Sequence, residues 1–106
     1  MDKLRKYRRI LKSVTEKHAQ ISSPMNWVQS TAVCDFEQNN YFLIDFDAKE
    51  KKHYIVFHLR LDDGKIFIEQ DGIEYGIAED LIEAGVSSKD LVQLIHSPDK
   101  EVSLAA

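Results

Sequence analysis

The chain has 106 residues, a formal net charge of −4, 43% hydrophobic and 30% charged residues. These values fit one globular domain over residues 1–106 and exclude a disordered chain. No apolar run approaches the roughly 20 residues that cross a bilayer, and the N-terminus is charged, so we expect a cytoplasmic protein without membrane association. Cys34 is the single cysteine; it excludes an internal disulfide, and we expect it to be a small hydrophobic residue of a strand.

Residues 2–21 carry apolar side chains at spacings of three and four, which predicts an amphipathic α-helix. Its apolar stripe comprises Leu4, Tyr7, Leu11, Val14, His18 and Ile21. The opposite side carries four cations: Arg5, Arg8, Arg9 and Lys12. The sequence Ser22-Ser23-Pro24 ends the predicted helix, because proline and the residue before it both disfavour the helical conformation.

Four stretches alternate polar and apolar residues and predict strands: 28–36, 41–46, 53–61 and 65–70. The polar turn 37–40 predicts a hairpin between the first two. Asp63-Gly64 joins the last two, and this dipeptide favours a type I′ turn with positive φ at both positions. In the third strand, Ile55, Phe57, Leu59 and Leu61 share the face predicted to be buried. We therefore expect a four-stranded antiparallel sheet.

The C-terminal part predicts two short helices. Ile73, Ile77 and Leu81 repeat at intervals of four, and Gly85-Val86 is typical of a helix C-terminus with its hydrophobic contact. Ser87 and Asp90 resemble a capping box for a third helix through Leu91, Leu94 and Ile95, closed by Pro98. The fold class is therefore α+β, with an N-terminal helix, a four-stranded antiparallel sheet and two short C-terminal helices against one face.

Two surfaces are candidates for binding. The second face of the predicted sheet is partly apolar, through Tyr41, Leu43, Tyr54, Val56 and Phe67. We expect something to cover it, and a second subunit of a homo-oligomer is one candidate. The other surface is the basic helix face of Arg5, Arg8, Arg9 and Lys12. It is either a solvated helix face or a contact for nucleic-acid phosphates.

Carboxylates cluster in residues 62–83: Asp62, Asp63, Glu69, Asp71, Glu74, Glu79, Asp80 and Glu83. Such a cluster can bind a divalent ion or supply an acid and a base. Asp63 and Asp71, however, each precede a glycine in a turn, and the EF-hand spacing fails, including at Asp45 and Asp47. The stretch 45–49 bears only a faint likeness to metal-dependent nucleases. Each of the four histidines, His18, His53, His58 and His96, is more simply explained by a structural partner.

Motifs for nucleophilic, nucleotide and redox chemistry are absent from the sequence, which has no Gly-x-Ser-x-Gly, phosphate-cradling loop or Cys-x-x-Cys. We therefore expect no catalytic residues, no cofactor and no metal. A metal-dependent hydrolase or nuclease using Asp45, Asp47 or the acidic segment is the least favoured alternative.

An ordered series of residues over nearly the whole chain carries a family resemblance. Its members are Asp2 to Leu4, Tyr7, Asp35-Phe36, Asn40-Tyr41, Lys65 to Gly72, Glu74, Gly76 to Ala78, Leu81, Gly85-Val86, Asp90 to Val92 and His96 to Pro98. In this series the chain resembles the XisI family, the fdxN element excision controlling factors of cyanobacteria. It departs from the family at Phe67, usually tryptophan, at Ile73, usually threonine, and at Ser87 and Ser97, often proline. After Lys100 the usual arginine and aromatic ending is absent.

The resemblance implies a non-enzymatic accessory protein that controls excision of a DNA element by a site-specific recombinase. It also implies a XisH-like partner of nuclease-like fold. Protein association, with a second copy and with the XisH-like partner, is therefore the leading hypothesis. Direct DNA binding through the basic helix face is the main alternative.

Overall fold

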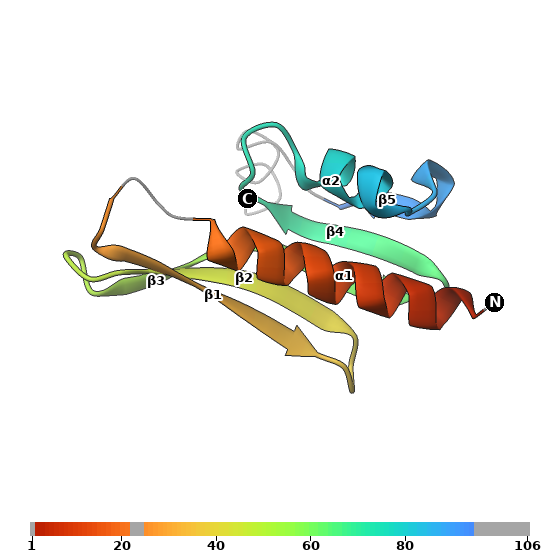
Figure 1. Ribbon diagram of the computed structural model, residues 1–106, viewed down its shortest axis with the longest axis horizontal. Helices are drawn as coiled ribbons and strands as arrows, with labels where there is room; N and C mark the ends of the chain where they lie inside the picture. Colours follow the sequence, from red (N-terminus) through yellow and green to blue (C-terminus); the bar gives the residue numbers. More distant parts are fainter. Residues whose placement is uncertain (1, 22–24, 95–106) are drawn as a thin grey trace, which may run out of the picture.

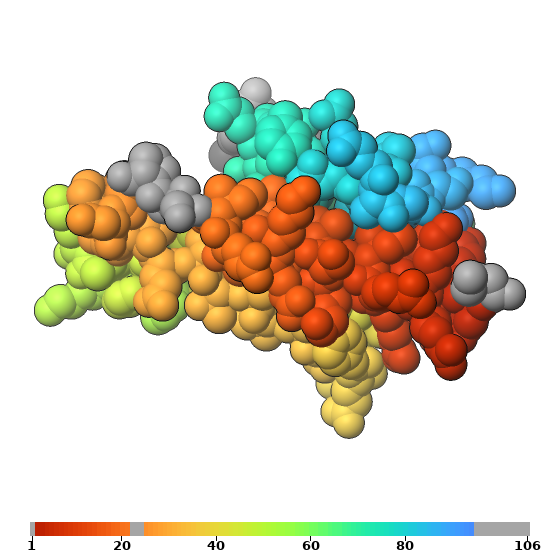
Figure 2. Space-filling model, in the orientation of Figure 1, coloured from red at the N-terminus to blue at the C-terminus, as the bar shows by residue number. Residues whose placement is uncertain are grey.

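The computed structural model describes residues 2–21 and 25–94. The elements are α1 (Lys3–Gln20), β1 (Val28–Asp35), β2 (Asn40–Asp47), β3 (Lys52–Asp62), β4 (Lys65–Asp71), α2 (Ile77–Ala84), the 3-10 turn η1 (Ser88–Asp90) and β5 (Leu91–Gln93). The strands form one five-stranded sheet in chain order, with β1 to β4 antiparallel and β5 parallel to β4. α1 and α2 lie side by side over one face of this sheet (Figure 1). Figure 2 views the molecule from this helical side.

α1 forms where the sequence predicts it. The Asp2 carboxylate accepts a 3.0 Å hydrogen bond from the Leu4 N–H and so caps the helix. The buried face consists of Tyr7, Ile10, Leu11, Val14, Thr15 and His18. The prediction that Leu4 and Ile21 belong to the buried stripe is wrong, because their side chains are 40% and 57% exposed. Ile21 is the C-cap in an extended conformation, so its side chain leaves the helical stripe.

The face assignment predicted for β2 is wrong. Tyr41 and Leu43, expected on the second face, are 0% and 4% exposed and belong to the core. The strand register gives the reason, since Tyr41 lies opposite Leu59 and Leu43 lies opposite Phe57. Residues directly opposite each other share a face, so both side chains join the face covered by α1. Phe42, Ile44 and Phe46 therefore lie on the other face.

A β-bulge in β3 also changes the predicted faces. Leu43 pairs with Phe57 but the next residue, Ile44, pairs with Ile55, which leaves Val56 as the extra residue. Ile55, predicted to be in the core, is consequently on the open face and 43% exposed. Val56, predicted on that face, packs instead against the core. Tyr54, opposite Asp45, is 44% exposed, and its hydroxyl donates to Glu50.

Two predicted chain reversals are confirmed. Asp63 and Gly64 have φ of 51° and 73°, as a type I′ turn between β3 and β4 requires. Gly85 ends α2 with φ of 118°, and the N–H of the buried Val86 bonds the carbonyl of Leu81 at 3.0 Å. α2 begins later than predicted, because the Asp71 carboxylate accepts hydrogen bonds from the N–H groups of Ile73 and Ile77.

The third predicted helix is wrong. Ser87 makes no side-chain capping bond, and only the short turn η1 forms. Leu91–Gln93 then becomes β5, whose Leu91 pairs with Ile66 of β4. A three-residue strand has too short a pattern to be distinguished from a helix start, and here pairing with β4 decides the conformation. Ile95 and Pro98 lie outside the described residues.

Candidate functional site

The open face of the sheet, opposite α1, is the main candidate site. It carries partly or largely exposed apolar side chains from β1, β2, β3 and β4, and we call this set the outer sheet face: Val33, Phe42, Ile44, Phe46, Ile55 and Phe67. Within residues 2–21 and 25–94 both helices pack on the opposite side. Of the residues predicted for this face, Phe67 is on it and Tyr41, Leu43, Tyr54 and Val56 are not. The sequence therefore predicts that this face is apolar, but it does not predict which residues lie on it.

Phenylalanine and histidine rings lie in two close pairs on the outer sheet face. The rings of Phe42 and His58 stack with centroids 4.1 Å apart, and Phe46 and His53 lie 4.7 Å apart. The His58 Nε2 is 2.8 Å from the Asn40 Oδ1. Burial lowers the pKa of His58; Glu69 opposes this shift and Arg60 adds to it. A neutral imidazole results, so the centre of the face is uncharged at neutral pH.

Arg60 borders this uncharged centre. Its guanidinium carbon lies 4.4 Å from the centroid of the Phe67 ring, and its Nε donates a 2.8 Å bond to Glu69. A longer 3.3 Å bond reaches Asp62. The hydrogen bond that Arg60 donates to Glu69, with smaller contributions from the charges of Glu69 and Asp62, raises the pKa of Arg60. The face thus has an aromatic centre and a charged border, in which the positive charge of Arg60 is paired with the carboxylates of Glu69 and Asp62.

The basic helix face is less available than its sequence suggests. The Arg8 Nε donates to the Asn39 Oδ1 at 2.9 Å and its other end reaches the Phe36 carbonyl at 3.3 Å, so Arg8 fastens α1 to the β1–β2 turn. Lys12 pairs with Glu16 at 3.0 Å. Arg5 and Arg9 are exposed and make no ion pair within the described chain. Two of the four predicted cations therefore remain available to a phosphate.

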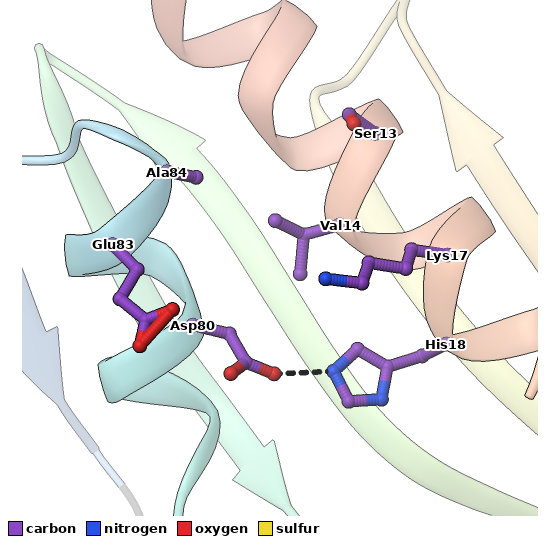
Figure 3. A pocket seen from close by; sticks show the side chains of 7 residues that line it. All are labelled: Ser13, Val14, Lys17, His18, Asp80, Glu83 and Ala84. Carbon is purple, nitrogen blue, oxygen red and sulfur yellow. Dashed lines mark hydrogen bonds and ion pairs between the residues drawn. The ribbon is translucent and has the colours of Figure 1, made fainter.

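A cleft of about 200 Å³ lies between α1 and α2 (Figure 3). Within it the His18 Nε2 and the Asp80 Oδ2 are 2.5 Å apart, and the Tyr75 hydroxyl donates to the same oxygen at 2.9 Å. His18 also meets the Phe57 ring edge-on. Figure 3 shows Ser13 at the far end of the cleft from His18, so the Ser13 hydroxyl is not aligned with this histidine for nucleophilic attack. The pair connects the two helices, as predicted for a partnered histidine.

Six of the carboxylates singled out in the sequence have structural partners: Asp45, Asp47, Asp62, Glu69, Asp71 and Asp80. Asp45 accepts a 2.5 Å bond from the Ser30 hydroxyl, and Asp47 accepts the N–H groups of Lys49 and Glu50 in the following turn. Among the residues that the structure describes, no three His, Cys, Asp or Glu side chains come together as a metal-binding group. The helices described there include none long and apolar enough to cross a membrane.

Comparison with known proteins identifies the family of this chain. The family model of the XisI protein matches residues 1–103. The chain belongs to the XisI family. A crystal structure of a XisI-like protein from Anabaena variabilis ATCC 29413 is similar with a TM-score of 0.78 and 26% identity, over 92% of this chain and 91% of that one. A crystal structure of the fdxN element excision controlling factor XisI from the same organism is similar with a TM-score of 0.73 and 27% sequence identity, over 93% of this chain and 98% of that one. No curated protein matches.

Proposed function

We propose that this member of the XisI family is a non-enzymatic accessory factor that controls excision of a DNA element by a site-specific recombinase. It acts by binding a XisH-like protein through the outer sheet face. Family membership and the similarity to an fdxN element excision controlling factor support the regulatory role. The single observation that carries the mode of action is the apolar, aromatic sheet face left open opposite α1.

The composition of this face suits a protein partner. Protein interfaces have an apolar centre enriched in aromatic residues and arginine, and a polar border. Phe42, Phe46 and Phe67 supply the aromatic centre, and the Arg60–Glu69 pair supplies part of the border. Because His58 is neutral, a partner does not have to desolvate a charge at the centre.

Copurification with a matched pair of variants tests this mode of action. Ile55 on the outer sheet face is 43% exposed and Ile82 on α2 is 46% exposed. Because the two side chains are similarly exposed, we expect the fold to tolerate a lysine equally well at either position. We expect Ile55→Lys to lower the yield of a coexpressed XisH-like chain at least tenfold, and Ile82→Lys to leave it unchanged. Circular dichroism verifies that both variants fold. Equal retention of the partner by the two variants would refute the proposal.

Direct DNA contact through α1 is the second candidate, and the exposed, unpaired Arg5 and Arg9 favour it. Replacing Arg5, Arg9 and Lys12 together by alanine would then weaken DNA binding, and the dependence of affinity on salt would become shallower. Fluorescence anisotropy with a labelled duplex at two salt concentrations measures both effects. An unchanged affinity in the triple variant removes this candidate.

A further inference from the structure

The solvent-exposed sides of α1 and α2 carry opposite charges. Four exposed cations of α1 make no ion pair within the described chain: Arg5, Lys6, Arg9 and Lys17. α2 has no basic residue, and its exposed Glu79 and Glu83 are equally without an ion pair there. Because the two helices lie side by side on the face seen in Figure 2, this face has a positive half and a negative half.

The cleft between α1 and α2 separates the two halves. Lys17 and Glu83 enter it from opposite sides (Figure 3), but their charged groups form no ion pair. A second hollow of about 300 Å³, lined also by Ile10, continues along the junction of the two helices. Ser13 and Ala84 line both hollows, and these small side chains let another helix approach the junction closely. We call the exposed residues around this junction the helical surface: Ser13, Lys17, Glu79, Glu83 and Ala84.

The helical surface suits a partner that carries both charges in the same arrangement. A polyanion such as DNA would be attracted by Lys17 but repelled by Glu79 and Glu83 on the neighbouring helix. A second copy of the chain meets the requirement. A two-fold contact uses the same surface twice, so it needs a surface whose charges are complementary to one another.

We propose that the helical surface binds the helical surface of a second copy, with the two-fold axis along the cleft. This axis exchanges the two halves, so α1 of each copy packs on α2 of the other. An axis across the helices would instead set α1 against α1, where like charges oppose each other. Rotation about the cleft does not change the position of a residue along it. Since Glu83 lies across the cleft from Lys17, Glu83 of one copy is then level with Lys17 of the other and pairs with it.

Sedimentation equilibrium at low salt, where surface charges are least screened, tests the pairing. The monomer has a mass of 12.2 kDa, and we expect a species of twice that mass. Glu83→Lys should raise the dimer dissociation constant at least tenfold, because the two-fold axis makes each substitution act twice. Glu37→Lys is the matched control: it makes the same charge change at an exposed turn residue outside the helical surface and should leave the constant unchanged. A monomer at every concentration, or a dimer indifferent to Glu83→Lys, would overturn the proposal.

A mixture of two variants tests the arrangement of the copies. Glu83→Lys and Lys17→Glu each place like charges across the contact, so neither chain should pair with itself. An equimolar mixture should form a heterodimer, because the native Lys17 then meets the native Glu83 and the two introduced charges meet each other. Within each chain the two positions still carry like charges, so the restored dimer cannot result from a repaired monomer. A mixture that stays monomeric would overturn the proposal.

Self-association and partner binding should be separable, because the outer sheet face lies on the opposite side of the sheet from α1 and α2. Copurification of the XisH-like chain should therefore persist in Glu83→Lys, and the dimer should persist in Ile55→Lys. Circular dichroism verifies that each variant folds. A dimer that Ile55→Lys dissociates and Glu83→Lys does not would place the second copy on the outer sheet face and overturn this inference.

Discussion

The Tyr7 hydroxyl donates a 2.6 Å hydrogen bond to the carboxylate of Asp90, which lies 83 positions later in the chain. Tyr7 is on α1 and Asp90 ends η1, so the bond fastens the segment before β5 to the first helix. The Tyr7 oxygen also accepts the Ser87 N–H at 3.2 Å, and Lys3 reaches Asp90 at 3.0 Å. Residues at both ends of the described chain thereby share one buried polar cluster.

Tyr7→Phe should lower the melting temperature by roughly 4–8 °C, the shift expected for losing a buried hydrogen bond in a domain of this size. The phenylalanine keeps the packing, but Asp90 then keeps only Lys3 as a partner and the Ser87 N–H loses its acceptor. Tyr75→Phe is the matched control: Tyr75 also donates to an aspartate, at 2.9 Å, but is 59% exposed. Thermal unfolding of both variants should show a small shift for Tyr75→Phe, and equal shifts would contradict the buried role of Tyr7.

Asp90 should make stability depend on acid. The hydrogen bond from Tyr7, followed by that from Lys3, lowers the pKa of Asp90 in the folded state. The ionised carboxylate therefore stabilises the fold above its unfolded pKa of about 3.9, and this contribution is lost as the pH falls through the lower folded pKa. Urea unfolding should show Asp90→Asn less stable than the natural chain at pH 7, with the difference shrinking below about pH 4. A constant difference down to pH 2 would contradict this linkage.

His58 should make stability depend on pH in a higher range than Asp90 does. Since burial lowers its pKa in the folded state, the neutral form stabilises the fold above the unfolded pKa of about 6.5, and this contribution disappears as the pH falls through the lower folded pKa. We expect His58→Gln to lose less stability than the natural chain between pH 7 and pH 5. Urea titrations at several pH values measure this difference. His53→Gln, altering an exposed histidine on the same face, is the control.

The prediction of elements from sequence succeeded where local chemistry decides the conformation. Asp2 caps α1, Asp63-Gly64 forms its turn and Gly85 ends α2, and each depends on residues close in the chain. The faces of β2 were not predictable in this way. Both alternating sets of that strand are apolar, Tyr41 and Leu43 on one side and Phe42 and Ile44 on the other, so the pattern alone does not select the buried set.

The bulge at Val56 is the second reason why the candidate site was misassigned. Its effect is to move Ile55 from the predicted core to the outer sheet face. The signal lies sixteen residues further on, at Gly72, whose N–H bonds the Val56 carbonyl at 2.6 Å. That contact is tertiary, and a sequence read in short windows does not contain it. Glycine at this position appeared to be turn chemistry, whereas its close approach to β3 is what requires it.

Gly72→Ala should destabilise the fold by about 1–3 kcal/mol, the usual cost of a steric clash in a packed region. A Cβ at Gly72 would lie 2.7 Å from the Val56 carbonyl oxygen, and this oxygen belongs to backbone that cannot rotate away as a side chain can. Glu74→Ala, an exposed substitution two residues later, should change stability little. Urea unfolding compares the two variants. Similar unfolding free energies of the two variants would contradict this prediction, because they would show that β3 can shift at the bulge without a loss of stability.

Leu43 and Phe42 are neighbours whose substitutions should have opposite effects. Leu43 is 4% exposed in the core, so Leu43→Ala should cost about 2–5 kcal/mol of unfolding free energy. Phe42 lies on the outer sheet face, where its ring stacks on His58, so Phe42→Ala should cost less stability. It should instead lower copurification of a XisH-like chain at least tenfold, because aromatic side chains at an interface centre carry much of the binding energy. Urea unfolding and copurification of both variants separate folding from binding. A Phe42→Ala chain that is as unstable as Leu43→Ala, yet still retains the partner, would assign Phe42 to the core and remove the outer sheet face as the binding surface.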